Sequence, residues 1–156
     1  MDAAPAARLD NLVALLRDKG CRITPQRLAI LRLLVHSRGH PSAEQMHVRL
    51  LRRFPTMSLA TVYKTIALLK QAGEVLELQF SELGNRYDGL RPTPHPHVIC
   101  TACGAIVDAD DPLLCDAAER VARETGYAVF SHRLDFFGLC PACRKKREAA
   151  DPTQTA

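Results

Sequence analysis

Four cysteines in two pairs carry the clearest chemistry in this sequence. Cys100 and Cys103 form one CxxC knuckle, and Cys140 and Cys143 form a second one farther along the chain. Each knuckle turns two thiolates toward one point, and two knuckles complete the tetrahedral Cys₄ shell that suits Zn²⁺. Because protein sulfurs then fill every position, no place remains for a substrate water, and such a zinc is structural. A pair of redox CxxC motifs or disulfides is the alternative.

A second cluster, of histidines and aspartates, surrounds the first knuckle. His95 and His97 flank Pro96, and the extended backbone next to proline places both imidazoles on the same side of the chain. Asp88 precedes this segment, and Asp108 follows the first knuckle. Nitrogen and oxygen donors suit Fe²⁺, Mn²⁺ or Zn²⁺ and differ from the thiolate site. Solvated loop histidines with ordinary turn aspartates are the alternative.

The first half of the chain is predicted to be mainly helical. Apolar spacing predicts a helix over 9–19 that ends at Gly20, and Thr24 followed by proline predicts the start of a second. Ser42 and Gln45 have capping-box spacing for a third helix. Ser58 opens a fourth, which ends at Gly73 and whose predicted buried stripe is Leu59, Val62, Ile66 and Leu69.

The pattern then changes to the period of a strand. Leu76, Leu78 and Phe80 alternate with polar residues, which predicts a half-buried strand. Leu83-Gly84-Asn85 supplies a turn, and the chain returns over 86–88. Helices followed by a two-stranded hairpin are typical of a winged helix-turn-helix.

The second half predicts a smaller mixed unit. Residues 89–96 contain three prolines and one glycine, which indicates a short, stiff linker. Strands are expected over 97–100 and 105–108, a helix over about 112–125, and a long strand over 127–137 on which His132 packs beside Phe130, Leu134 and Phe136. A polar tail follows the last cysteine.

These elements predict an α+β fold. It comprises an N-terminal winged-helix DNA-binding domain and a small C-terminal α/β dimerisation domain stabilised by structural zinc. The expected bounds are 1–88 for the DNA-binding domain, 89–94 for a hinge, 95–147 for dimerisation and metal sensing, and 148–156 for a flexible tail.

Charge and composition limit the function classes. Residues 1–93 carry 14 Lys+Arg against 8 Asp+Glu, whereas residues 94–156 carry 7 against 9, so only the front half is expected to meet a polyanion. The start of the chain has no apolar signal region, and there is no apolar run of membrane-spanning length. We therefore expect a cytoplasmic protein without a membrane partner, in which disulfides are rare.

Several segments together resemble the ferric-uptake-regulator family over about residues 9–147. They are RITPQR at 22–27, HPSAEQ at 40–45, SLATVYKTIALL at 58–69, NRYDG at 85–89, HPHVICTACGAIVD at 95–108 and HRLDFFGLCPAC at 132–143. The resemblance implies a homodimeric, metal-responsive repressor with a winged helix and an α/β dimerisation domain.

Within that family the chain is most similar to the peroxide-responsive PerR branch. The resemblance implies that the regulatory metal, Fe²⁺ or Mn²⁺, has five ligands, with His40 joining the four residues of the second cluster. Aspartate at 88 and 108, where iron-uptake regulators typically place glutamate, favours this branch. Pro94 and Pro96 stand where a third metal site would have ligands, so that site is expected to be absent. The stretch between Asp88 and His95 is one residue longer than the family pattern. The implied ligands of the regulatory metal are His40, Asp88, His95, His97 and Asp108.

The helix beginning at Ser58 is the expected recognition helix for the major groove of an operator. Its predicted DNA-contacting residues are Ser58, Ala60, Thr61, Tyr63 and Lys64. By resemblance, Arg22 probes an A·T-rich minor groove. Inert structural roles are expected for Cys21, Cys115, His36, His47 and His132.

The predicted function is metal-dependent repression at inverted-repeat operator DNA. By resemblance, peroxide oxidises a ligand histidine, His40 or His95, and releases the DNA. An iron- or zinc-uptake repressor of the same family is one alternative. A metal-dependent hydrolase is another, but the sequence has no HExxH, GxSxG or P-loop motif, and we expect no enzyme.

Overall fold

A computed structural model describes residues 5–80 and 84–150, and the chain divides into two compact units, Met1–Thr93 and Pro94–Ala156. The mixed helix and strand content agrees with the predicted α+β class. Among the described residues, no helix has both the length and the apolar character needed to cross a membrane.

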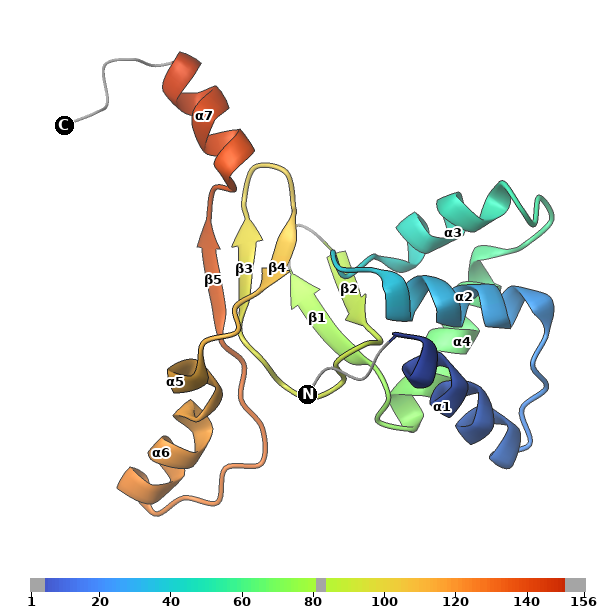
Figure 1. Cartoon of the computed structure of the whole chain (residues 1–156), viewed down its shortest axis with the longest axis horizontal. Helices are drawn as coiled ribbons and strands as arrows, with labels where there is room; N and C mark the ends of the chain where they lie inside the picture. The colour runs from blue at the N-terminus through green and yellow to red at the C-terminus, as the bar shows by residue number, and fades with distance from the viewer. Residues whose placement is uncertain (1–4, 81–83, 151–156) are drawn as a thin grey trace. The chain divides into compact units, whose positions relative to one another are not determined.

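The first unit consists of four helices followed by a hairpin (Figure 1). The two strands of the hairpin are antiparallel, with Leu78 opposite Arg86. This is the predicted winged-helix order. The elements are α1 (Pro5–Asp18), α2 (Pro25–His36), α3 (Ala43–Leu51), α4 (Leu59–Gln71), β1 (Leu76–Phe80) and β2 (Gly84–Asp88).

Three helices of this unit begin at the predicted caps. The Thr24 hydroxyl accepts a hydrogen bond from the Arg27 backbone N–H at 3.2 Å. Ser42 and Gln45 form both bonds of a capping box. Ser58 caps α4 by accepting from its third helical residue. Each cap satisfies an otherwise unbonded N–H and is worth about 1 kcal/mol, so the helix starts are encoded locally.

The core of the first unit lies between the helices. Each fully buried aliphatic side chain contributes roughly 1.5–3 kcal/mol, and the predicted stripe of α4 supplies part of this set. Within the stripe, Leu59 is only half-buried, whereas its other three members are buried. The side chains with the lowest exposure include Leu12, Leu16, Ile30, Leu31, Leu34, Val35, Met46, Val62 and Leu69.

The second unit is built on a three-stranded sheet in which β3 is central. Strand β4 pairs with it antiparallel and β5 pairs with it parallel. Few apolar side chains of this unit are buried, so its core is thin. The elements are β3 (His97–Cys100), β4 (Ile106–Asp108), α5 (Pro112–Cys115), α6 (Ala117–Thr125), β5 (Asp135–Gly138) and α7 (Pro141–Ala150).

The predicted long strand over 127–137 is wrong for most of its length. Strand β5 begins only at Asp135, which pairs with His97. The chain before His97 contains Pro94 and Pro96, which have no N–H to donate to a ladder. Upstream residues therefore have no strand to pair with, and Phe130 is 97% exposed. The predicted strand face around His132 does not form.

Three further predictions need correction. The helix expected over 112–125 is interrupted at Asp116, whose φ of −85° and ψ of 0° depart from helical geometry. The tail expected from 148 is helical as far as Ala150, because Ala, Arg, Lys and Glu favour helix. Gly84 and Asn85, predicted in a turn, belong to β2, while Leu83 and residues 151–156 lie outside the described residues.

Candidate metal centres

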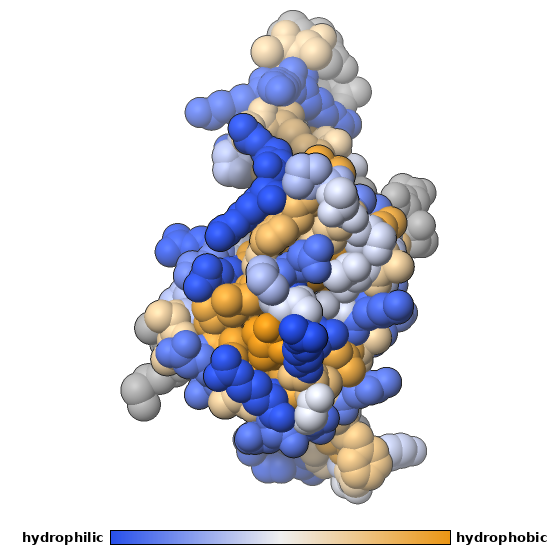
Figure 2. Space-filling model, turned by 90° about the vertical axis from the view of Figure 1, so that its right-hand side faces the viewer, coloured by the Kyte–Doolittle hydropathy of each residue, from blue (hydrophilic) through white to orange (hydrophobic). Residues whose placement is uncertain are grey.

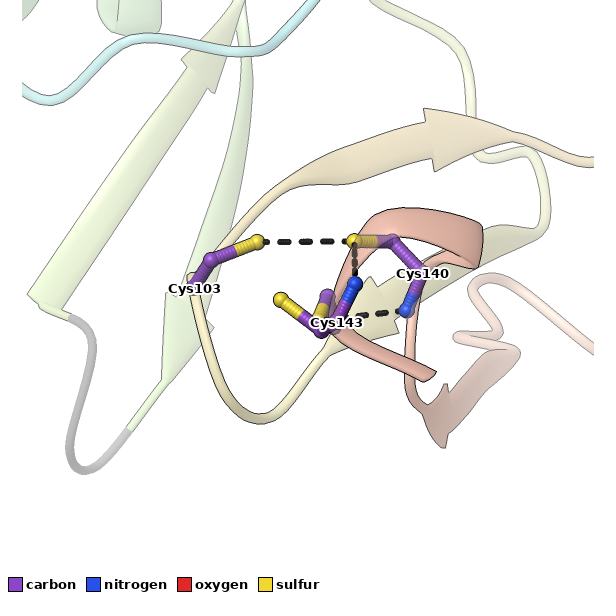
Figure 3. A group of neighbouring side chains, drawn as sticks. Cys103, Cys140 and Cys143 are labelled. Carbon is purple, nitrogen blue, oxygen red and sulfur yellow. Dashed lines mark hydrogen bonds between the residues drawn. The ribbon is translucent and has the colours of Figure 1, made fainter. Parts of the chain in front are cut away.

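The four cysteines come together in the second unit, as predicted. Cys100 ends β3, Cys140 follows β5, and Cys143 lies in the first turn of α7. Their four sulfurs all lie within 4.8 Å of one another, and Figure 3 shows those of Cys103, Cys140 and Cys143 turned toward one another. The Cys103 and Cys140 sulfurs are 3.8 Å apart. A tetrahedron with zinc–sulfur bonds of about 2.3 Å has edges of about 3.8 Å.

The pKa shifts of these cysteines are also consistent with a bound cation. The Cys140 backbone N–H donates to the Cys100 sulfur at 3.3 Å, and such bonds lower the pKa of Cys100 to about 6. Hydrogen bonds with the Cys140 sulfur, and to a smaller extent with the Cys103 sulfur, raise the pKa of Cys143 to about 12. Four sulfurs this close cannot all be thiolates unless a positive ion compensates their charge, which Zn²⁺ does. The donor set therefore fits structural zinc.

A cluster of nitrogen and oxygen donors lies at one end of the strands of the same sheet. His97 opens β3 and is the register partner of Asp108, which ends β4. One oxygen of Asp108 lies 3.4 Å from Nε2 of His95 and 3.9 Å from Nε2 of His97. The two imidazole centroids are 4.3 Å apart. The predicted convergence of these three residues is present.

Burial distinguishes this cluster from ordinary loop histidines. His95 is 6% exposed and His97 is 1% exposed. Two buried imidazoles with their Nε2 atoms beside one carboxylate oxygen form a donor set for a borderline divalent ion such as Fe²⁺, Mn²⁺ or Zn²⁺. The alternative of solvated loop histidines is wrong.

The other two implied ligands lie together in the first unit. His40 and Asp88 are both 2% exposed, and the His40 Nδ1 atom is 3.7 Å from the Asp88 Oδ2 atom. The second Asp88 oxygen accepts from the backbone N–H groups of Leu90 and Arg91, at 2.8 Å and 3.0 Å. These two bonds fix the carboxylate so that Oδ2 faces the imidazole.

A buried arginine holds the loop that carries His40. Arg86 Nε donates to the His40 carbonyl at 2.6 Å, and its Nη2 donates to the Gly39 carbonyl at 3.1 Å. His40 has a φ of +45°, which is uncommon for a residue other than glycine. Burial, followed by the nearby charge of Arg49, lowers the pKa of Arg86. Arg86 therefore stabilises a loop conformation that the backbone alone disfavours.

The predicted recognition helix presents its predicted polar face to solvent. Ser58, Ala60, Tyr63 and Lys64 are exposed and Thr61 is half-buried. Arg22, before α2, is also exposed. In Figure 2 hydrophilic residues cover much of the visible face, around a smaller hydrophobic area.

Tyr63 already has a partner on the neighbouring helix. Its hydroxyl donates to a Glu44 carboxylate oxygen at the start of α3. This bond lowers the pKa of Glu44 and raises the pKa of Tyr63. A hydroxyl held in this way presents its ring in a defined orientation.

Comparison with known proteins identifies the family. A sequence model of the ferric uptake regulator family matches residues 18–137. The chain is 40% identical over 141 residues to the peroxide operon regulator of Bacillus subtilis, covering 90% of this chain and 97% of that protein.

The chain belongs to the ferric uptake regulator family. The family match ends at residue 137, before Cys140 and Cys143. The assignment of these two cysteines to the zinc site therefore comes from the distances between the four sulfurs.

Two solved structures of this family extend the comparison. One concerns peroxide sensing and gene regulation by PerR from Streptococcus pyogenes, at 38% identity and a TM-score of 0.51, covering 87% of this chain and 92% of that one. Another is a zinc uptake regulator in complex with zinc and DNA, at 25% identity and a TM-score of 0.63, covering 93% of this chain and 98% of that one.

Three further histidines and Cys21 have ordinary surroundings, whereas the side chain of Cys115 lies outside the described part of the structure. His36 Nδ1 lies 2.8 Å from the Arg32 carbonyl oxygen, and His47 Nε2 lies 2.7 Å from that of Met57. Such backbone contacts agree with the structural roles predicted for both. Half-buried positions are found for His132 and Cys21.

Two residues beside the candidate ligands were missed from the sequence. Arg86 was not singled out because nothing in NRYDG says that its side chain is buried. Asp135 was missed because the predicted strand was too long and its register with β3 was unknown. The only local signal for Asp135 was its place two residues after Arg133 and directly before two phenylalanines.

Proposed function

We propose that this chain is a homodimeric, metal-dependent repressor that binds operator DNA and releases it when peroxide oxidises a metal ligand. The observation that carries the proposal is the cluster of buried His95 and His97 with half-buried Asp108, whose donors suit a regulatory ion distinct from the Cys₄ zinc. Relatives named as peroxide regulators support the response to peroxide.

The proposed regulatory ion has ligands from both units. His40 and Asp88 provide one pair, and the cluster of the second unit provides three more donors. Two donors alone hold a divalent ion weakly, whereas five hold it well, so binding restricts the linker at 89–94. A ligand shifts a conformational equilibrium only by its differential affinity for the two states, and typical allosteric coupling is about 1–3 kcal/mol.

DNA recognition is proposed for α4 and Arg22. Exposed Lys64 supplies charge to phosphate or guanine, and Tyr63 offers its ring to thymine methyl groups. A dimer reads an inverted repeat with two such helices. Large exposed apolar side chains in the second unit support dimerisation through it, among them Leu113, Tyr127, Phe130 and Phe137.

Release is proposed to follow loss of a ligand nitrogen. Bound Fe²⁺ would activate peroxide beside its ligands without net change. The imidazole of His40 or His95 supplies the two electrons: its ring carbon gains one peroxide oxygen, and the other peroxide oxygen leaves as water. The oxidised ring is a poorer donor, so the two units are no longer held at operator spacing. We further propose a cytoplasmic regulator and not an enzyme, in line with the reduced thiolate site and the regulatory relatives.

Operator binding measured with each metal tests this proposal. Zinc-retaining protein is titrated against labelled operator with Fe²⁺ or Mn²⁺, before and after brief peroxide exposure. We expect release only with Fe²⁺, together with a gain of about 16 Da, one oxygen atom, on a peptide containing His40 or His95. Replacing Asp108 with Glu is expected to keep repression and blunt the peroxide response.

Two outcomes contradict the proposal. Oxidation confined to cysteines indicates a thiol sensor. Metal-dependent binding that peroxide leaves unchanged with every metal indicates an iron- or zinc-uptake repressor.

A further inference from the structure

His97 has an aspartate on each side of it in the sheet. Strand β3 lies between β4 and β5, and His97 is the register partner of both Asp108 and Asp135. The three side chains therefore form one row across the sheet. Asp108 is a proposed ligand of the regulatory ion, whereas Asp135 has no part in the proposed function.

The two carboxylates face different nitrogens of the imidazole. Asp108 Oδ1 lies 3.9 Å from His97 Nε2, and Asp135 Oδ1 lies 3.7 Å from His97 Nδ1. The His95 ring adjoins the Nε2 side, because its own Nε2 is 3.4 Å from the same Asp108 oxygen. The donors that converge are therefore on the Nε2 side, and Asp135 faces the opposite edge of the ring.

Asp135 is buried enough for its charge to matter. Its side chain is 8% exposed, and Arg133 Nε donates to its Oδ2 oxygen. The arginine compensates the charge at one oxygen, and the other oxygen faces the imidazole. A buried carboxylate is stabilised by hydrogen-bond donors, so the His97 nitrogen that faces Asp135, Nδ1, should carry the proton.

We propose that Asp135 is a positioning residue for the regulatory metal site. At 3.7 Å the Asp135 Oδ1 atom is next to His97 Nδ1 but not yet hydrogen-bonded to it. When the regulatory ion binds at Nε2, Nδ1–H would donate to this oxygen, and the Nε2 lone pair stays directed toward Asp108 and His95. A carboxylate behind a ligating imidazole fixes the tautomer and the ring orientation and raises the basicity of the ligand nitrogen. The inference rests on the proposed function, since it takes His97 Nε2 as a metal ligand.

The expected effect is on affinity for the ion and not on folding. Removing such a supporting group typically costs about 10-fold to 100-fold in metal affinity. Asp135→Asn retains a neutral acceptor of the same shape, so we expect a loss of about 10-fold. Asp135→Leu removes the acceptor, and the loss should approach 100-fold.

The test measures Mn²⁺ affinity of zinc-retaining full-length protein by competition with a fluorescent chelator. Asp116→Asn is the matched control, because Asp116 lies in the same unit and its side chain makes no helix-capping bond. Zinc content and thermal melting show whether each variant is folded. We expect weaker Mn²⁺ binding with unchanged zinc content for both Asp135 variants and no change for Asp116→Asn.

Nitrogen NMR of His97 in unmutated protein gives a second readout that needs no variant. In the neutral imidazole, the proton is expected on Nδ1. A proton on Nε2 overturns the inference even if the variants fail to fold.

A reference variant separates the two proposals. If Asp108→Ala loses Mn²⁺ binding while Asp135→Asn retains full affinity, the role of Asp135 is refuted and the proposed function stands. If Asp108→Ala also binds Mn²⁺ normally, the proposed function itself fails.

Discussion

Replacing Arg86 with lysine should loosen the loop that carries His40. The guanidinium donates through two different nitrogens to the carbonyls of Gly39 and His40. A lysine ammonium keeps the charge but has a single nitrogen, so it can reach only one of these two carbonyl oxygens. The substitution removes one hydrogen bond from a charged donor, which is worth about 1.5–3 kcal/mol. We take about 2 kcal/mol as the expected cost.

Hydrogen exchange measured by mass spectrometry reports this cost locally. A loss of about 2 kcal/mol makes exchange about 30-fold faster, since 1.4 kcal/mol corresponds to a factor of ten. The informative peptide spans residues 37–46, where the start of α3 bonds back to Ser42. Arg38→Lys is the matched control, because Arg38 is exposed and two residues before His40.

The same variant should weaken Mn²⁺ binding by on the order of tenfold, as expected for a group that supports a ligand. The reasoning is refuted if Arg86→Lys leaves exchange of the 37–46 peptide as slow as in the control. Faster exchange with unchanged Mn²⁺ affinity would instead separate the loop from the metal site.

Three further predictions concern single positions. Cys143→Ser should abolish zinc retention and lower the melting temperature of the second unit, because its thin core depends on the ion; metal analysis and calorimetry check this, and a variant that retains zinc contradicts it. Tyr63→Phe should return the pKa of Glu44 upward toward its ordinary value, because the hydroxyl that stabilises the carboxylate is lost; an NMR titration in which the Glu44 pKa does not move would count against the pairing. Gly89→Ala should destabilise the first unit by about 1–3 kcal/mol, because the new methyl group meets the Leu34 Cβ at 2.9 Å; wild-type resistance to urea would show that the neighbour yields at no cost.

The helices of the first unit were predictable because their signals are local. Caps at Thr24, Ser42 and Ser58 satisfy N–H groups of the next turn, and this chemistry is written within four residues of sequence. Strand β3 was predicted with its full bounds, His97–Cys100, for a related reason. Proline stops the ladder before it, and the cysteine knuckle ends it.

The errors lie where structure depends on distant partners. Residues 127–134 have a strand-like composition, but a strand forms only where β3 offers N–H groups, which limits β5 to Asp135–Gly138. The polar composition after Cys143 predicts a tail, but Ala, Arg, Lys and Glu favour helix, and α7 continues to Ala150.

The candidate sites divide in the same way. The cysteine pairs were predictable from spacing, since a CxxC knuckle needs no distant information. The burial of His95 and His97, the arginine beneath His40 and the carboxylate behind His97 depend on strand register and packing. Residue types and spacing suggested His95, His97, Asp88 and Asp108 as donors, and only the family resemblance added His40.

The most direct test of the account compares operator affinity with the regulatory ion present and absent. Protein that keeps its Cys₄ zinc is stripped of weakly bound metal, and its binding to operator DNA is measured by fluorescence anisotropy with and without added Mn²⁺. A coupling of about 1–3 kcal/mol predicts binding that is about 5-fold to 150-fold tighter with Mn²⁺. Equal affinity in the two states contradicts the claim that nitrogen and oxygen donors of both units control DNA binding through one shared ion.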